Sequence, residues 1–253
     1  MRVFITGASS GIGAALARDY AATGATLGLA ARRQSRLFEL AAELPGNHAT
    51  YPLDVADAAA LQAAAADFSA CFGCPDIVIA NAGVSVGTLT SETDDLPAFR
   101  RVLETNLLGM VHSFAPFVAA MQQRGSGTLV GIASVAGIRG IPGAGAYSAS
   151  KAAVIAYLES LRVELRGSGV KVLTLVPGYI ATPMTAQNPY PMPFMLPADV
   201  AARRFARAIE RGASYAVIPW QMGLVAKLLR LLPNPLFDAI FAHAGRKPRG
   251  LEL

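Results

Sequence analysis

Tyr147 and Lys151 stand four residues apart in AYSASKAAV, which spans residues 146–154. On a helix, residues i and i+4 share one face, so the phenol and the ammonium can reach a common volume. A free tyrosine has a pKa of about 10, and a nearby cation favours its ionised form. At ~4 Å and an effective dielectric constant of ~20 the attraction is about 4 kcal/mol, enough to lower the phenol pKa by a few units before desolvation opposes it. The pair predicts a general acid and base, and the alternative is a buried structural pair without chemistry.

A glycine-rich turn, TGASSGIG, follows the first apolar run of the chain. Gly7, Gly11 and Gly13 have the spacing G-x-x-x-G-x-G. Such a turn from strand to helix brings the backbone close to a pyrophosphate and offers it free N–H groups at the helix N-terminus. The turn therefore predicts a dinucleotide site, and the alternative is that the glycines only permit a tight turn.

The elements that must position these groups follow from alternating short apolar runs and segments of helical spacing. Strands are expected within 2–7, 26–32, 49–55, 76–83, 127–135, 171–178 and 214–220, and helices within 11–24, 56–72, 95–124, 148–167 and 197–211. This rhythm predicts one α/β domain with a doubly wound, Rossmann-type parallel sheet and helices on both faces. Such sheets bind ligands at the carboxyl ends of their strands, where the glycine turn lies.

Composition excludes several classes of protein. The 253 residues are 53% hydrophobic and 15% charged, which suits one large globular domain. Residues 1–199 hold 13 Lys or Arg and 14 Asp or Glu, and residues 200–253 hold 9 and 3, so the net charge of +5 arises in the C-terminal part. Without zinc-finger spacing or a basic stripe we expect no nucleic acid partner. The chain opens without a leader pattern, so we expect a cytoplasmic location.

Two cysteines, Cys71 and Cys74, form the segment CFGC. A lone C-x-x-C can be a redox motif or half of a metal site, but no second pair accompanies it. We interpret the cysteines as small apolar side chains at a helix end, and we expect no metal.

The chain resembles the short-chain dehydrogenase/reductase family over residues 1–220. The resemblance rests on the order of short motifs: the glycine turn, Asp54 in LDV, NAG at Asn81 to Gly83, Asn106 in ETNLLG, Ser134 in GIASV, Tyr147 with Lys151, and PGYIAT from Pro177 to Thr182. It implies an oxidoreductase that transfers a hydride between a nicotinamide dinucleotide and a carbonyl or alcohol.

The resemblance also implies the residues of the site. The implied catalytic set is Asn106, Ser134, Tyr147 and Lys151. In it, Ser134 donates a hydrogen bond to the substrate oxygen, Lys151 also holds the nicotinamide ribose, and Asn106 supports a proton relay through water. The implied cofactor-binding residues are Gly7, Ser9, Ser10, Gly11, Ile12, Gly13, Arg32, Arg33, Asp54, Val55, Asn81, Ala82, Gly83, Tyr147, Lys151, Pro177, Gly178, Ile180 and Thr182, with Asp54 and Val55 lining the adenine.

The end of the second strand, LAARRQSR, bears on the choice of cofactor. An acidic residue about 20 positions after the glycine turn binds the ribose 2′-hydroxyl of NAD, whereas an arginine accommodates the 2′-phosphate of NADP. Ala31 stands where family members that use NAD tend to carry Asp, and Arg32 and Arg33 follow it. We expect NADP, and the alternative is that the arginines are solvated charges opening the next helix.

Residues 179–197 are rich in proline and contain three methionines. The family keeps a substrate lid at this place, and methionines adapt to irregular apolar shapes. We therefore expect an NADPH-dependent reductase of a lipophilic ketone or aldehyde; a packed surface loop is the alternative for the segment. A non-catalytic NADP-binding regulatory protein of the same fold is the alternative for the function.

Residues 221–253 form an apolar, basic C-terminal extension beyond the resemblance. Apolar segments with cationic flanks can lie on an anionic membrane surface, so peripheral membrane contact is one hypothesis. The other is that the segment packs over the substrate site or a neighbouring subunit. Helix 99–121 carries apolar residues on more than one face, and the matching helix of the family pairs across a two-fold axis, so we expect a homodimer or homotetramer.

Overall fold

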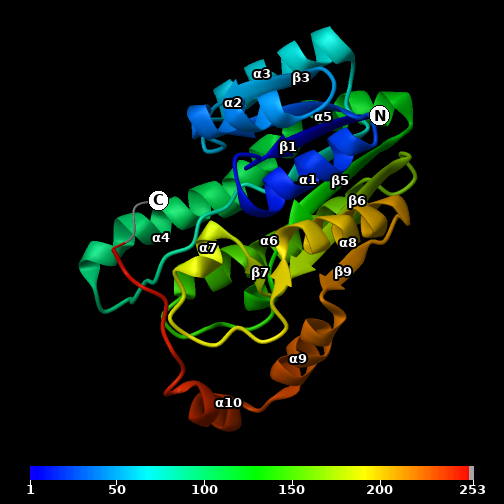
Figure 1. The fold of residues 1–253 in the computed structure, drawn as a ribbon. Coiled ribbons are helices and arrows are strands. Elements are labelled where there is room, and N and C mark those ends of the chain that lie inside the picture. Colours follow the sequence, from blue (N-terminus) through cyan, green and yellow to red (C-terminus); the bar gives the residue numbers. More distant parts are fainter. Residues whose placement is uncertain (251–253) are drawn as a thin grey trace.

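A parallel β-sheet forms the centre of the molecule (Figure 1). The computed structural model of the protein describes residues 1–250. Within them the main sheet has seven strands, β1 Arg2–Thr6, β2 Thr26–Ala31, β3 His48–Pro52, β4 Ile77–Ala80, β5 Gly127–Ile132, β6 Val170–Pro177 and β9 Tyr215–Ile218, in the order β3-β2-β1-β4-β5-β6-β9. The order reverses between β1 and β4, which is where doubly wound sheets form their ligand crevice. The predicted fold class is confirmed.

Helices cover both faces of the sheet (Figure 1). One face packs against α1 Gly11–Ala22, α2 Gln34–Glu43 and α8 Ala198–Glu210, and the other against α3 Ala58–Phe72, α5 Gly109–Arg124 and α6 Gly145–Glu164. Strand β1 shows why helices cover both faces of the sheet. Its side chains Val3 and Ile5 belong to the first apolar cluster and Phe4 to the second, and all three are fully buried. A strand buried on both faces has an unbroken apolar run rather than an alternating one.

The segment expected as one helix over 95–124 is divided in the structure. Helix α4 spans Leu96–Leu103, a π-helical turn follows over Glu104–Leu108, and α5 begins at Gly109. A π turn inserts an extra residue into a helix and is frequent at functional sites. Here the inserted turn contains Asn106, which is completely buried.

Two short strands join the ends of the segment that we expect to be the lid. β7 Ile180–Ala181 pairs in parallel with β8 Leu196–Pro197, and α7 Pro183–Ala186 lies between them. Thr182 caps α7 through a reciprocal hydrogen-bonded box with Thr185. The loop between residues 187 and 195 is therefore held at both ends beside β6.

The C-terminal extension packs onto the rest of the domain. It contains α9 Trp220–Leu231 and α10 Asn234–Phe241, and residues 242–250, the C-terminal strap, run back toward α4 (red in Figure 1). Arg139 fixes the junction of the two helices by donating to the carbonyl oxygen of Leu229 at 2.6 Å and stacking 4.1 Å from the centre of the Phe237 ring. Within residues 1–250, no helix is long and apolar enough to cross a membrane.

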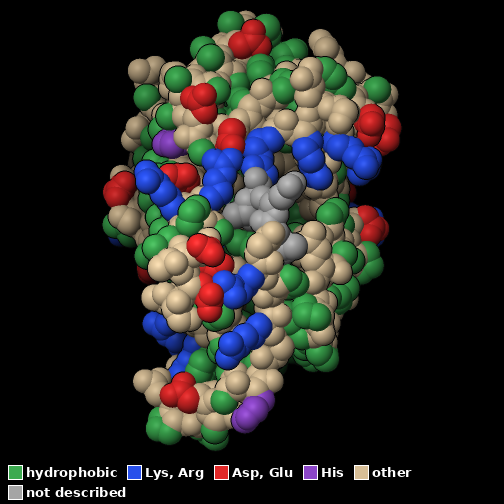
Figure 2. All heavy atoms as spheres, turned by 90° about the vertical axis from the view of Figure 1, so that its left-hand side faces the viewer, with side chains coloured by type: hydrophobic (Ala, Val, Ile, Leu, Met, Phe, Trp, Pro, Cys, Tyr) green, Lys and Arg blue, Asp and Glu red, His purple; other side chains and the backbone are tan. Residues whose placement is uncertain are grey.

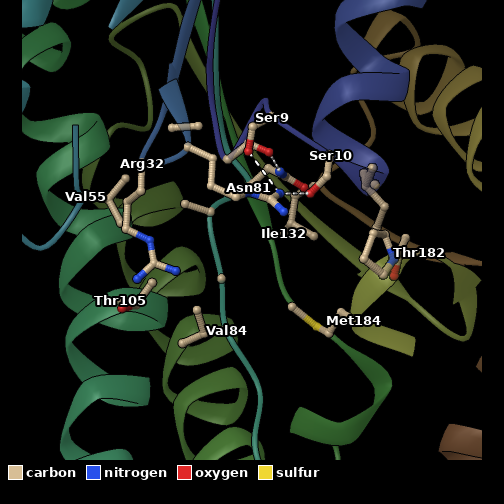
Figure 3. A pocket seen from close by; sticks show the side chains of 18 of the residues that line it. Ser9, Ser10, Arg32, Val55, Asn81, Val84, Thr105, Ile132, Thr182 and Met184 are labelled. Carbon is tan, nitrogen blue, oxygen red and sulfur yellow. Dashed lines mark hydrogen bonds between the residues drawn. The ribbon is translucent and has the colours of Figure 1, made fainter. Parts of the chain in front are cut away.

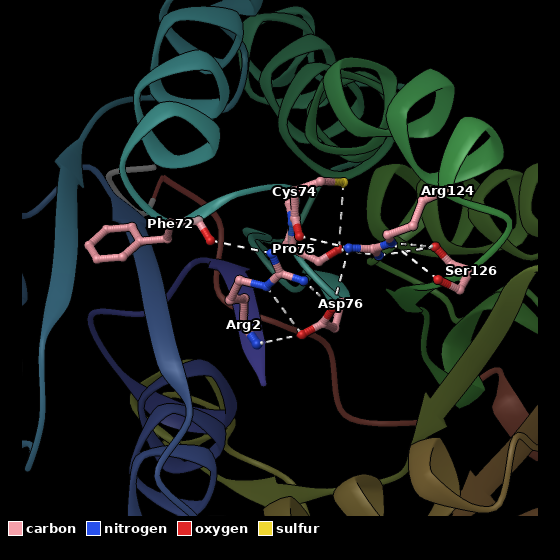
Figure 4. A network of polar contacts seen from close by, with 7 residues as sticks. All are labelled: Arg2, Phe72, Cys74, Pro75, Asp76, Arg124 and Ser126. Carbon is pink, nitrogen blue, oxygen red and sulfur yellow. Dashed lines mark hydrogen bonds and ion pairs between the residues drawn. The ribbon is translucent and has the colours of Figure 1, made fainter.

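A network of polar contacts holds the amino end of the sheet, opposite the glycine turn (Figure 4). Asp76 accepts from the backbone N–H and the guanidinium of Arg2, both at 2.8 Å, and from Arg124 at 3.3 Å. Arg124 also donates to the carbonyl oxygen of Cys74 at 2.8 Å. Cys71 and Cys74 are both free thiols. The C-x-x-C segment lies in a structural network at the end of α3.

Candidate active site

A cavity of about 400 Å³ lies at the carboxyl ends of the strands, at the point where the strand order reverses (Figure 3). It is lined by most of the residues expected to bind a cofactor, namely Gly7, Ser9, Ser10, Gly11, Ile12, Arg32, Arg33, Asp54, Val55, Asn81, Ala82, Gly83, Tyr147, Lys151, Pro177 and Thr182. Leu53, Val84, Thr105, Ile132, Ala133, Pro183 and Met184 also line it and were not expected.

Three expected cofactor-binding residues lie behind the cavity wall. A Cβ on Gly13 would stand 2.3 Å from the carbonyl oxygen of Gly7, so this glycine permits close packing inside the turn. A Cβ on Gly178 would meet the Met222 side chain at 2.5 Å, and Ile180 is buried in the core. These three residues shape the wall instead of lining the cavity.

The glycine turn is fixed against strand β4. Gly7 has φ +68°, and a Cβ there would stand 2.7 Å from the Cα of Ala82. Asn81 holds the same contact by donating from Nδ2 to the carbonyl oxygens of Thr6 at 3.1 Å and Gly7 at 3.2 Å. Ser10 N-caps α1, so the first turn of this helix offers its free N–H groups toward the cavity. The arrangement suits a phosphate.

Two arginines stand at the same end of the cavity. The Arg33 guanidinium donates to the hydroxyl of Ser9 at 3.1 Å and to that of Ser10. Figure 3 shows Arg32 extending along the wall near Val55 and Thr105. Neither arginine forms an ion pair within residues 1–250, so two cations and two hydroxyl groups are available to an anionic group here.

Asp54 lines the cavity and also forms an ion pair that was not expected. Burial works to raise its pKa, but the Ala56 amide and the Arg101 guanidinium outweigh this effect, so the pKa of Asp54 falls below its ordinary value. The Asp54 carboxylate pairs with Arg101 at the end of α4. Arg101 was not expected from the sequence, because only the fold brings it to Asp54.

Tyr147 and Lys151 project from the first turns of α6, as their spacing predicts. Lys151 Nζ donates to the carbonyl oxygen of Ile132 at 2.7 Å and lies 5.9 Å from the centre of the Tyr147 ring. Burial raises the pKa of Tyr147 and the neighbouring Ser134 hydroxyl opposes this change, whereas burial lowers the pKa of Lys151 to about 8. The phenol pKa is therefore raised and not lowered as expected, because burial outweighs the hydrogen bond with Ser134.

Asn106 and Ser134 lie beside this pair without lining the cavity. Asn106 accepts from the Val84 N–H at 2.8 Å and donates to the Val84 carbonyl oxygen at 3.0 Å and to the Ser150 hydroxyl at 2.9 Å. Ser134 Oγ accepts from the Ala136 amide at 3.2 Å. The fold thus brings the four expected catalytic residues to one end of β4, β5 and α6.

The C-terminal strap adds a residue that the sequence did not predict at this place. Lys247 Nζ lies 5.7 Å from the centre of the Tyr147 ring and donates to the Ser85 hydroxyl at 2.7 Å. The last residues of the extension therefore pack against the domain beside Tyr147. The sequence signal was the basic end of the chain, but a contact across 162 positions cannot be deduced from it.

Comparison with known proteins gives matches over nearly all of the chain. The sequence model of the short chain dehydrogenase family matches residues 1–191. An uncharacterized oxidoreductase of Myxococcus xanthus is 40% identical over 240 residues, covering 93% of this chain and 94% of that protein.

Solved structures agree with this match. A short-chain dehydrogenase from Streptomyces avermitilis superposes with a TM-score of 0.80 at 26% identity, covering 96% of this chain and 95% of that one. A short-chain dehydrogenase from Sphingobium yanoikuyae in complex with NADPH gives 0.78 at 27% identity, covering 92% and 96%. A 3-oxoacyl-[acyl-carrier protein] reductase from Brucella melitensis with bound NAD gives 0.76 at 28% identity, covering 86% and 88%.

Proposed function

This chain belongs to the short-chain dehydrogenase family, and we propose that it is an NADPH-dependent reductase of a lipophilic ketone or aldehyde. The observation that carries the proposal is that Tyr147 and Lys151, with Ser134 beside them, share one cavity with Arg32 and Arg33. The site offers both proton donors and cations for a phosphate.

The residues of the cavity fit a dinucleotide. The close packing around Gly7 and Gly13 leaves no room for a Cβ, so the turn stays tight and the N–H groups at the start of α1 remain free for a pyrophosphate. Ser9, Ser10 and the two arginines would hold the 2′-phosphate of NADP, and Asp54 with Val55 would line the adenine. Since the family neighbours include both NADPH and NAD complexes, the preference for NADP rests on the arginines of this chain.

Tyr147 would give the proton that completes the reduction. NADPH held in this cavity would supply a hydride, one hydrogen with both electrons of its bond, to the carbonyl carbon. The carbonyl oxygen accepts a hydrogen bond from Ser134 and a proton from Tyr147, and an alcohol results. Burial keeps Tyr147 protonated until the substrate oxygen takes the proton, while Lys151 and Asn106 would lead a replacement proton to the phenol through water.

The walls near Tyr147 favour an apolar substrate. Val84, Ile132 and Met184 line the same cavity as Tyr147, and Met184 lies on α7 of the expected lid (Figure 3). Methionine adapts to irregular apolar shapes, so the pocket suits a lipophilic carbonyl better than a small polar one.

Two associations belong to the same proposal. We propose that the protein is a homo-oligomer, since α4 and the π turn leave Leu96 and Leu108 half exposed.

We also propose that α9 contacts an anionic membrane surface, because the exposed Lys227 on this helix complements anionic lipid. The contact would be made by the apolar stripe Trp220, Leu224, Leu228 and Leu231.

A cofactor and substrate screen tests the proposed activity. The purified protein is mixed with NADPH or NADH and a panel of apolar ketones, aldehydes and alkyl oxo esters, and cofactor oxidation is followed by absorbance. We expect NADPH-dependent reduction of several panel members. NADPH binding without turnover of any panel member, together with unchanged NADPH affinity in Tyr147→Phe, would instead support a regulatory protein.

A further inference from the structure

Two lysines from distant parts of the chain lie near the ring of Tyr147. Lys151 Nζ is 5.9 Å from its ring centre and Lys247 Nζ is 5.7 Å from it. Lys151 lines the cofactor cavity, but Lys247 does not. Lys247 therefore faces the tyrosine from outside the cofactor cavity, on the side formed by Ser85 and the strap.

The strap that carries Lys247 is docked in place by backbone and side-chain contacts. The Gly87 N–H donates to the carbonyl oxygen of Pro248 at 2.8 Å, and a Cβ on Gly87 would stand 2.2 Å from the Lys247 carbonyl oxygen. Arg249 donates to the Asp95 carboxylate at 2.8 Å and pairs with Glu92 at 3.2 Å. The strap thus holds the Lys247 ammonium at a fixed place beside the tyrosine.

The strap also lies against the expected lid. A Cβ on Gly245 would stand 2.8 Å from the Cβ of Tyr190, which belongs to the loop between β7 and β8. Lys247 consequently stands where the lid, the strap and the Ser85 segment meet near Tyr147. A carbonyl compound whose oxygen reaches Tyr147 from this side would have its remaining atoms beside Lys247.

Among residues 1–250 the Lys247 ammonium is desolvated without a countercharge. Its single hydrogen bond within residues 1–250 goes to the Ser85 hydroxyl, and no carboxylate of this range pairs with it. Burial alone lowers the pKa of Lys247 to about 8. The side chain is therefore charged at neutral pH, but its charged form is destabilised by desolvation. A partly buried charge is stabilised when it is paired, and an anionic group bound there would supply the pair.

We infer that Lys247 is a substrate-binding residue and that the substrate is an apolar oxo acid, whose carbonyl oxygen meets Tyr147 and whose carboxylate binds the Lys247 ammonium. This inference rests on the proposed reductase function and narrows its substrate class. The apolar residues near Tyr147 take the body of the acid and the strap takes its charged end. Figure 2, which faces the side where the strap lies, shows Lys and Arg side chains gathered across its middle, in keeping with anionic ligands.

Matched substrates test this assignment. Medium-chain 2-oxo and 3-oxo acids are compared with the methyl esters of the same acids, and kcat/KM is measured with NADPH for each pair. We expect the wild-type protein to prefer the acids and Lys247→Met to lower the acid-to-ester ratio by about 10- to 100-fold, the effect of losing a hydrogen bond to a charged group.

Two control variants separate recognition from strap stability. Lys247→Arg keeps the charge and should keep most of the acid preference, whereas Lys227→Met removes an exposed lysine of α9 and should leave the ratio unchanged. Thermal unfolding of each variant reports whether the fold persists. An unchanged ratio in Lys247→Met, or equal loss of the ratio in Lys247→Arg and Lys247→Met, would overturn the inference.

A binding measurement distinguishes failure of the inference from failure of the proposed function. Calorimetric titration of the NADPH-loaded protein with a saturated medium-chain carboxylate should show binding that Lys247→Met weakens about tenfold or more. Carboxylate binding of this kind without any carbonyl reduction would overturn the reductase and keep the anion site. Reduction of esters without carboxylate binding would overturn the anion site and keep the reductase.

Discussion

Replacing Tyr147 with phenylalanine removes the proton donor and little else, because the ring keeps its half-buried place in the first turn of α6. General acid catalysis contributes about 100- to 10,000-fold, so Tyr147→Phe should lower kcat by at least ~100-fold. NADPH affinity and thermal unfolding should stay near those of the wild type. Turnover above about a tenth of the wild-type value, with chemistry rate-limiting, would show that another group supplies the proton.

Arg32 and Arg33 should decide between the two dinucleotides. The wild-type protein should use NADPH with higher kcat/KM than NADH, and the double variant Arg32→Ala/Arg33→Ala should lose about 10- to 100-fold of this preference, mainly through the KM for NADPH. Arg36→Ala is the matched control, since Arg36 pairs with Glu39 on the exposed face of α2. Equal efficiency of both cofactors in the wild-type protein would contradict the assignment.

The charge of Lys247 gives a pH dependence of known sign. Its pKa of about 8 means that the ammonium is present below pH 8 and is lost as the pH rises through this value. For an oxo acid, kcat/KM of the wild-type protein should therefore fall above pH ~8, while Lys247→Arg stays charged. Because Tyr147 and Lys151 titrate in both proteins, the ratio of the Arg variant to the wild type should rise several-fold from about pH 7 to 9. A flat ratio would show that the titration of Lys247 does not matter.

Helix α9 exposes an apolar stripe that the domain does not use. Leu228 and Leu231 are 65% and 79% exposed, and Trp220 is 66% exposed, while Met222 and Ala226 face the domain. The double variant Leu228→Gln/Leu231→Gln should reduce co-sedimentation with phosphatidylserine-containing vesicles at low salt by about tenfold, without changing kcat. Deleting residues 222–253 is a poorer test, because it removes the strap with the helix. Loss of self-association instead of vesicle binding in the double variant would assign the stripe to a second copy.

Elements whose cause is local could be predicted from the sequence. The run RVFIT and the glycine turn after it determine β1 and the start of α1, because an apolar run buried on both faces needs no distant partner to be identified. The π turn could not be predicted within 95–124. Its Asn106 forms hydrogen bonds with Val84, which exist only once the fold brings these two segments together.

Sites that join distant parts of the chain could be predicted only as far as a known motif connects them. Tyr147 and Lys151 share a helix, and the glycine turn follows its strand, so spacing alone located both ends of the cavity. The pKa of Tyr147 was predicted with the wrong sign because desolvation depends on the packing around α6. Lys247 was absent from the predicted site, since nothing in a basic C-terminus indicates that it returns to Ser85.

Self-association is expected from the surface of the α4–α5 segment. Leu96 and Leu108 are 57% and 47% exposed although they lie on helices packed against the domain, and Val163 at the end of α6 is 61% exposed. Pairing two copies across a two-fold axis would bury these side chains of both copies in one homodimer interface. Sedimentation at micromolar concentration should give at least twice the 26.3 kDa of one chain.

A charged variant tests which surface pairs. Leu108→Asp places a charge among the exposed apolar residues and should shift the protein toward monomers. Phe38→Asp changes a half-exposed residue on α2 and should leave the mass unchanged. A wild-type protein that sediments only at 26.3 kDa would contradict the expected pairing.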